Sequence, residues 1–284
     1  MAEGTEMEDA SAEGAFLAKA RRALEALFES AKRRDEFNFA LSLAPEFKAY
    51  TLTSASDAQL AFKQYVEFLQ AGQYKGQGIH FRVALALYCH TAEAAGLWGV
   101  PMCMLLVCAG DHYNVEPFAE LVKRHRVTGQ TVAPNANKVM GYLAEDAHDQ
   151  GMTELAEVFR DAFDADLRNG FAHADYALSH EGIHVRGRHD RERVVGWPEF
   201  QTIFDNGVGL FHLLGEVIGK CQRSYSTPKM VVGTSHPDQP PGPWIIYTDP
   251  ESRCMTVTGG PSWTEDRLLC DFHKRRPSAG DVER

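Results

Sequence analysis

The sequence predicts a mainly α-helical protein that carries two small β-containing regions. Three observations lead to this fold class. Apolar residues recur at helical spacing through most of the first 221 residues. A short stretch from about residue 176 to 195 alternates like the strands of a small hairpin or a three-stranded ribbon. After Pro228, short β-like pieces alternate with turns rich in proline and glycine.

Length and composition bound the organisation of the chain. Of its 284 residues 44% are hydrophobic, which is enough for a sizeable core. We expect a disordered acidic tail at 1–14, a helical domain at 15–227 and a small β-containing appendage at 228–284. The net charge of −10 opposes general adhesion to nucleic acid or anionic membranes, so an RNA contact requires a local basic surface. Residues 183–193 supply one, with these side chains: His184, Arg186, Arg188, His189, Arg191 and Arg193.

No segment has the pattern of a secretory signal or a bilayer span. The N-terminal segment has neither a basic start nor an apolar stretch. The longest uncharged run, 94–110, is interrupted by two glycines and Pro101, so we interpret it as a buried helical hairpin. The six cysteines include no Cys-x-x-Cys pair, which favours buried reduced thiols. We therefore expect a cytoplasmic protein with no membrane contact.

Six helices are expected before residue 150, each from apolar residues three or four positions apart. Pro45 ends the first, a loop with three glycines separates the second from the third, Pro101 opens the fourth, and Asn135 caps the sixth. The expected ranges are 16–43, 55–71, 79–97, 101–108, 115–126 and 136–149.

The next helix is expected to begin at a Thr153 cap and to carry a buried stripe with a member every four residues: Leu155, Phe159, Phe163, Leu167 and Phe171. Strands are expected near 176–178, 183–185 and 193–195. Pro198 suits the first turn of a helix that reaches about Cys221. In the C-terminal part, β-like pieces at 230–232, 244–247 and 255–257 precede a helix at 263–273.

Arg168, Asn169 and His173 are the candidate catalytic residues. An imidazole with a free pKa of about 6.5 exchanges protons near neutral pH, and a guanidinium holds phosphoryl oxygens in a planar fork. Metal-free RNA cleavage needs both, because protons must move and negative charge on phosphorus must be stabilised. However, Arg168 and His173 lie about 140° apart around an ideal helix. Convergence requires a distortion at Gly170 or a second copy of the motif.

The segment from Arg168 to Tyr176 resembles the signature of the HEPN superfamily, all-α bundles of higher eukaryotes and prokaryotes. That signature is an arginine, often followed by Asn or Asp, and a histidine four to six residues later. The order of motif helix, short hairpin and final helix is also similar, over about residues 80–221.

The resemblance implies a metal-independent endoribonuclease without a cofactor, acting on RNA as a homodimer in a toxin–antitoxin, antiviral or stress system, with an antitoxin or other regulatory protein as partner. In that case His173 is the general acid and base, Arg168 stabilises the transition state, and Asn169 orients or polarises. The candidate substrate-binding residues are Tyr176, His184, Arg186, Arg188 and Arg191.

Two further interpretations of this motif remain open. Many HEPN members keep the fold without nuclease activity, so a catalytically silent module that binds a nucleotide, RNA or a protein partner is the main alternative. In a purely structural role, His173 caps carbonyls, Asn169 bonds the following turn, and Arg168 pairs with Asp164 or Asp175. An active enzyme should place Arg168 and His173 along an exposed positive groove, whereas a silent module can bury or separate them.

Two metal-binding alternatives compete with the RNA interpretation. His180, Glu181 and His184 match the zinc-protease string His-Glu-x-x-His, which requires a helix so that both histidines face one metal. Residues 183–185 alternate like a strand, on which the two histidines would stand about 13 Å apart, so the protease is less favoured. A weaker signal is a metal-binding helical bundle, in which each helix supplies a carboxylate and an imidazole at i, i+3: His90 with Glu93, and Glu145 with His148.

Overall fold

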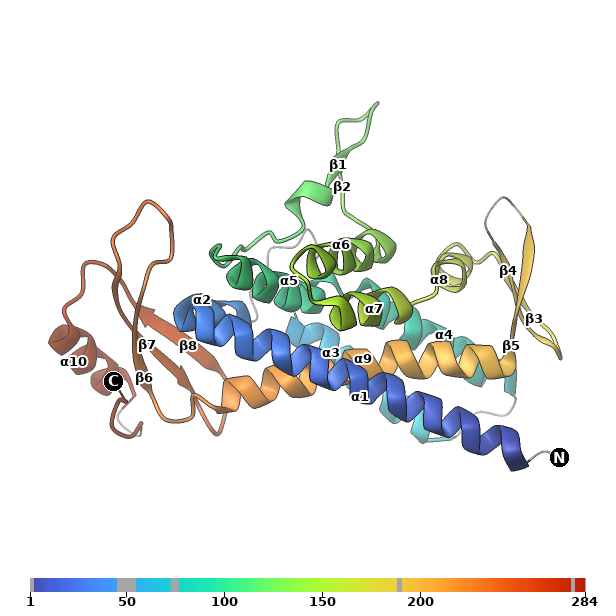
Figure 1. Ribbon diagram of the computed structural model, residues 1–284, viewed down its shortest axis with the longest axis horizontal. Coiled ribbons are helices and arrows are strands. Elements are labelled where there is room, and N and C mark those ends of the chain that lie inside the picture. The colour runs from blue at the N-terminus through green and yellow to red at the C-terminus, as the bar shows by residue number, and fades with distance from the viewer. Residues whose placement is uncertain (1–2, 45–54, 73–76, 188–190, 277–278, 284) are drawn as a thin grey trace. The chain divides into compact units, whose positions relative to one another are not determined.

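The computed structural model describes residues 3–44, 55–72, 77–187, 191–276 and 279–283. The described chain is mainly α-helical, with three small antiparallel sheets (Figure 1). The predicted fold class is therefore confirmed at the level of a mainly helical protein with small β regions.

The contacts divide the chain into two compact units. Unit 1 comprises Met1–Ala23, Lys48–Trp98 and Phe118–Leu213, and unit 2 comprises Leu24–Phe47, Gly99–Pro117 and Leu214–Arg284. Three helices supply residues to both units: α1 (Glu3–Arg34), α5 (Ala95–Ala109) and α9 (Trp197–Arg223). The predicted segments 1–14, 15–227 and 228–284 stay a prediction, and α1 begins within the first of them.

Unit 1 holds the motif region. Its further elements are α3 (Ala55–Gln70), α4 (Gln77–Glu93), the short helix η1 (Ala119–Leu121), β1 (Lys123–Arg124), β2 (Thr131–Val132), α6 (Ala136–Asp149), α7 (Thr153–Asp161), α8 (Ala165–Ala172), β3 (Tyr176–Leu178), β4 (Gly182–Arg186) and β5 (Glu192–Gly196). The β3–β4–β5 sheet lays its inner face on α4, α8 and α9 through a buried cluster that includes Leu85, Leu167, Ile183, Val195 and Phe200. Burying these side chains, at about 1.5–3 kcal/mol each, fixes the sheet beside the motif helix.

The expected single motif helix is wrong, because the structure contains two helices, α7 and α8. Asp164 leaves the helical conformation, with φ −87° and ψ 120°, and caps α8 by accepting a hydrogen bond of 2.8 Å from the Leu167 N–H. The Asp164 N–H in turn donates to the Tyr88 hydroxyl at 2.5 Å. The expected Thr153 cap is also wrong, since Met152 occupies that position without a side-chain bond. Of the predicted stripe, Leu155, Phe159 and Leu167 are buried, and Phe163 and Phe171 are half-buried.

Other predicted helix boundaries are wrong for similar reasons. The first helix is divided by Asp35, whose carboxylate accepts from the Asn38 N–H and starts α2 (Glu36–Leu43). The third ends at Glu93, and Pro101 lies inside α5 instead of opening it. Helix α5 is apolar around its whole circumference, so its packing overrides the local proline signal.

Residues 115–126 form no α-helix. They contain η1 and the first strand of the β1–β2 hairpin, whose turn includes Gly129 with φ 68°. By contrast, α6 and its Asn135 cap, α9 and the three strands of the β3–β5 sheet agree with the sequence.

The C-terminal part of unit 2 also agrees with the sequence. Strands β6 (Lys229–Gly233), β7 (Gly242–Thr248) and β8 (Met255–Gly259) form an antiparallel meander with β7 in the middle. Helix α10 (Glu265–Arg275) begins at a Thr264 cap and closes a small core of Met230, Ile245, Tyr247, Leu268 and Phe272. Aromatic Phe37 of α2 packs against Trp244 of β7, with ring centroids 4.8 Å apart.

One apolar stretch, Gly78–Ala109, is long and apolar enough to cross a bilayer. However, 78% of its most apolar window is buried inside the protein. A helix that is apolar all round and covered in this way is typical of a protein core. The cytoplasmic location stays a prediction.

Candidate functional site

The guanidinium of Arg168 lies inside unit 1. Its side chain is only 11% exposed and forms an ion pair with Glu93 at the end of α4. Nη1 donates a hydrogen bond of 2.7 Å to the side-chain oxygen of Asn169, and Nε is buried without a hydrogen-bond partner among the described residues. Burial lowers the pKa of Arg168, but a guanidinium remains charged near neutral pH. The ion-pair partner is thus Glu93, not the expected Asp164 or Asp175.

His173 lies at the exposed C-terminal end of α8. Its backbone N–H donates to the Asn169 carbonyl at 3.0 Å, and its exposed ring has no hydrogen bond or ion pair in the part of the chain that the structure describes. The next residue, Ala174, has φ 54°, and the Asp175 N–H donates back to the Gly170 carbonyl at 2.8 Å. This left-handed turn ends the helix and leads into β3. Within one chain, Arg168 faces α4 while His173 faces solvent.

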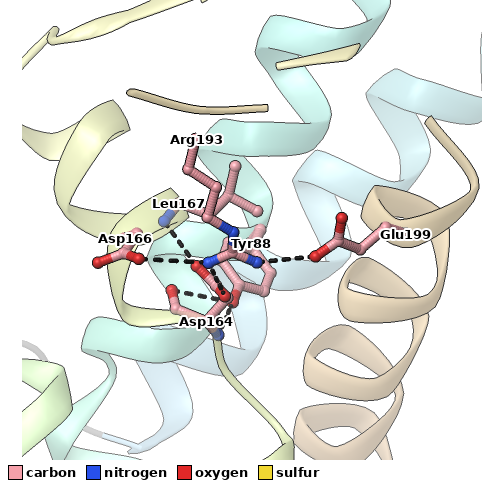
Figure 2. A network of polar contacts seen from close by, with 6 residues as sticks. All are labelled: Tyr88, Asp164, Asp166, Leu167, Arg193 and Glu199. Carbon is pink, nitrogen blue, oxygen red and sulfur yellow. Dashed lines mark hydrogen bonds and ion pairs between the residues drawn. The ribbon is translucent and has the colours of Figure 1, made fainter. Parts of the chain in front are cut away.

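A network of polar contacts fixes the start of α8 (Figure 2). Arg193 of β5 donates from Nη1 to Asp164 at 2.7 Å and to Asp166 at 3.3 Å, and from Nη2 to Glu199 of α9 at 2.7 Å. Burial alone would lower the pKa of Arg193, but hydrogen bonds from the Asp164 and Glu199 carboxylates outweigh it, and the pKa is raised. Because one guanidinium bridges α8, β5 and α9, the motif helix is held rigidly against the sheet.

Side chains along β3, β4 and β5 point alternately to the two sides of their sheet, which therefore has an inner and an outer face. Register pairs Ala177 with His184 and His184 with Val194, so these three lie across the outer face. In the next row of that face, Arg186 pairs with Glu192 and donates from Nε to Asp175 at 2.9 Å. The predicted substrate-binding residues His184 and Arg186 therefore share one face.

Tyr176 is bound by an arginine that is not among the candidate site residues named from the sequence. The exposed Arg82 of α4 donates to the Tyr176 hydroxyl at 2.5 Å, and its guanidinium carbon lies 5.3 Å from the centre of the ring. Phe171 supports the ring from α8, with centroids 5.6 Å apart. The exposed guanidinium of Arg82, held at the hydroxyl edge of the tyrosine, offers a planar surface on which a further planar group can stack.

An open pocket of about 470 Å³ lies along this region. It joins the end of α8 to the outer face, and its lining residues include Ala174, Tyr176, His184, Arg186 and Glu192. Arg191 is exposed, and its side chain makes no hydrogen bond or ion pair within residues that the structure describes. Arg188 and His189, also part of the predicted basic surface, lie outside the described residues.

His184 takes part in a chain of hydrogen bonds. Its Nδ1 lies 2.6 Å from Glu192 Oε1, and its Nε2 lies 2.8 Å from Ser179 Oγ. Neither Ser179 nor Glu192 was a candidate from the sequence, because their partnership with His184 depends on the register of three strands.

The zinc-protease string does not have the geometry that the chemistry requires. Residues 182–186 are strand β4, and the His180 side chain is 91% exposed at the turn before it. The other metal alternative also lacks support, because His90 contacts the Ala58 carbonyl and Glu93 is bound to Arg168. Among the described residues, no group of three or more histidine, cysteine or acidic side chains is placed to hold a metal ion.

Comparisons with protein-family models, with curated proteins and with solved structures find no match to this chain. The resemblance to the HEPN superfamily therefore depends on the segment from Arg168 to Tyr176 and on the order of α8, the β3–β5 sheet and α9. Membership in that family stays a proposal.

Proposed function

We propose that this chain binds single-stranded RNA without cleaving it, as a catalytically silent module of the HEPN type. The observation that carries the proposal is the inward position of Arg168. Its fork is already occupied by Glu93 and Asn169, so within one chain it cannot also hold the oxygens of a scissile phosphate. The buried partner is Arg168, and leaving its cation without the Glu93 carboxylate would cost free energy, which favours a structural role for the pair.

The choice of RNA follows from the side chains around the open pocket. Arg82, bound to the hydroxyl of the pocket residue Tyr176, offers a planar guanidinium to a base, and the exposed Arg191, next in the chain to the pocket residue Glu192, offers a cation to a phosphate. The His173 ring lies next in the chain to the pocket residue Ala174. Stacking surfaces beside separate cations suit unpaired bases better than a regular duplex. A net charge of −10 means that such a contact must be local.

The test is binding of a short fluorescent single-stranded RNA to the full chain at low salt in EDTA, followed by anisotropy. Arg82→Ala should weaken binding about fivefold or more, since a base stack contributes ~1–3 kcal/mol. Arg160→Ala is the matched control, because Arg160 is also an exposed arginine of unit 1 but lies on α7. Absence of binding, or equal effects of the two substitutions, would contradict the proposal.

A second candidate is the metal-independent endoribonuclease, favoured by the exposed His173 ring, which lies five residues after Arg168 and has no partner among the described residues. Cleavage would require a second copy of the chain and release of Arg168 from Glu93. The same RNA is therefore examined on a gel for products with cyclic-phosphate ends, and sedimentation gives the number of chains. Cleavage that His173→Ala abolishes, in a dimeric protein, would replace the silent module with the nuclease; intact RNA supports the silent module.

A further inference from the structure

Three side chains on the outer face of the β3–β5 sheet are linked in the order serine, imidazole, carboxylate. Ser179 follows β3, His184 lies in the middle of β4, and Glu192 begins β5. The Ser179 Oγ lies 2.8 Å from His184 Nε2, and His184 Nδ1 lies 2.6 Å from Glu192 Oε1. From this geometry we infer that the chain carries a Ser179–His184–Glu192 triad that hydrolyses short-chain carboxylic esters.

The hydrogen bonds determine which ring nitrogen carries the proton. An ionised carboxylate only accepts, so His184 Nδ1–H donates to Glu192. In the neutral ring the other nitrogen, Nε2, is then the acceptor for the Ser179 hydroxyl at 2.8 Å, a closer partner for Oγ than the Gly182 carbonyl at 3.4 Å. This is the arrangement in which an imidazole acts as the general base for a serine and a carboxylate orients the ring.

In the turn that follows the serine, the peptide group between His180 and Glu181 is hydrogen-bonded through both its carbonyl and its N–H. The His180 carbonyl accepts a hydrogen bond of 3.1 Å from the Trp197 indole, and the Glu181 N–H donates to Ser179 Oγ at 3.1 Å. The His180 N–H, which comes directly after the serine, has no partner among the described residues. The His180 N–H is therefore available to stabilise the negative oxygen of a tetrahedral intermediate, while the Glu181 N–H stays bound to the serine oxygen.

Space for the acyl group of the ester is available next to the triad. The open pocket of about 470 Å³ is lined by His184 and Glu192, and also by the small residues Ala174 and Ala177. Ser179 lies beside this pocket through its contact of 2.8 Å with the pocket residue His184. The pocket is open to solvent, which suits a small ester and also admits the water that completes the reaction.

The reaction balances with water as the only co-reactant. Ser179 Oγ forms a bond to the ester carbonyl carbon while its proton moves to His184 Nε2. The bond from that carbon to the alkoxy oxygen breaks, and the alcohol leaves with the proton from Nε2. Water then attacks the acyl-serine, gives a proton to Nε2, and the carboxylic acid leaves as Ser179 regains its proton.

The experiment treats the full wild-type chain with a fluorophosphonate probe, which forms a phosphorus–oxygen bond to an activated serine and releases fluoride. Peptide mass spectrometry then identifies the labelled residue. We expect label on Ser179, lost in Ser179→Ala and reduced about 100-fold or more in rate by His184→Ala. Glu192→Gln should reduce the rate less, because it perturbs the ring rather than removing it.

Ser224→Ala is the matched control, since Ser224 is an exposed serine whose hydroxyl bonds a carbonyl and no imidazole. Hydrolysis of p-nitrophenyl acetate should follow the same order of variants. Because the labelled position is read in the wild-type chain, the result does not depend on any variant folding. Absence of label on Ser179, or labelling that His184→Ala leaves unchanged, would overturn the inference. Neither outcome affects the RNA measurement, which needs no serine.

Discussion

At the scale of single residues, the most consequential finding is that Arg168 is paired inside its own chain. If this arginine is structural, Arg168→Met should lower the free energy of unfolding by about 1–3 kcal/mol, because it leaves the Glu93 carboxylate without its cation. The value lies below that of a fully buried pair since the Glu93 side chain is 39% exposed. Urea denaturation measures the loss.

The matched control for Arg168→Met is the double variant Arg168→Met/Glu93→Gln, in which no unpaired carboxylate remains. It should be more stable than the single variant. Equal stability of the wild type and Arg168→Met would mean that the arginine has no structural role, and would favour the nuclease over the silent module.

A second residue prediction concerns the end of α8. Ala174 has φ 54°, a left-handed conformation in which a side chain is strained and glycine is not. We expect Ala174→Gly to stabilise the protein by about 0.5–1 kcal/mol in thermal or urea unfolding. Ala172→Gly, two residues earlier but inside the helix, should instead destabilise by a similar amount. Destabilisation by both substitutions would contradict the turn described for this helix end.

At the scale of elements, the packing of α8 on β4 depends on a glycine. A Cβ added at Gly170 would lie 2.9 Å from Val185 Cγ1 and 3.2 Å from the Asp175 carbonyl oxygen. Gly170→Ala should therefore push the helix from the sheet and cost about 1–3 kcal/mol. In α6, a Cβ at Gly141 meets nothing within 4 Å, so Gly141→Ala should stabilise by about 0.5–1 kcal/mol. Calorimetric melting of both variants checks the contrast.

The elements also show which parts of the fold the sequence could predict. Helix α6 with its Asn135 cap and the C-terminal meander were predictable, because local turn and cap signals there agree with the apolar pattern. The division between α7 and α8 could not be predicted, since the stripe of apolar residues continues across it. Asp164 breaks the helix through Tyr88 and Arg193, which are distant in sequence. At Pro101 the sequence predicted a helix start that the structure does not have, because the packing of α5 overrides the local signal of the proline.

The candidate site divides in the same way. The sequence identified the motif residues Arg168, Asn169 and His173, because their spacing is local. It could not predict the orientation of the Arg168 side chain, since that depends on Glu93 of another helix. The partners of His184 could not be found from spacing, because Ser179 reaches it from the turn after β3 and Glu192 from the neighbouring strand β5. A one-residue change in register would place either of them on the inner face.

At the scale of the whole molecule, charge determines how RNA binding must depend on salt. The chain carries a net charge of −10, so attraction to RNA can come only from a few local cations. We define the proposed RNA face by three exposed arginines: Arg82, Arg186, which also contacts Asp175, and Arg191. With about three phosphate contacts, the slope of log affinity against log salt should be about −2 for single-stranded RNA. Raising the salt concentration fourfold should then weaken binding by roughly 20-fold.

That slope distinguishes a local face from diffuse attraction. Arg191→Ala should make the slope shallower by about 0.7, the contribution of one phosphate contact, and should weaken binding equally for RNAs of different sequence. Arg160→Ala should leave the slope unchanged, because Arg160 lies on α7, outside the proposed face. Anisotropy titrations at several salt concentrations measure both values. A slope near zero would exclude phosphate contacts, and a slope much steeper than −2 would mean that RNA contacts cations beyond this face.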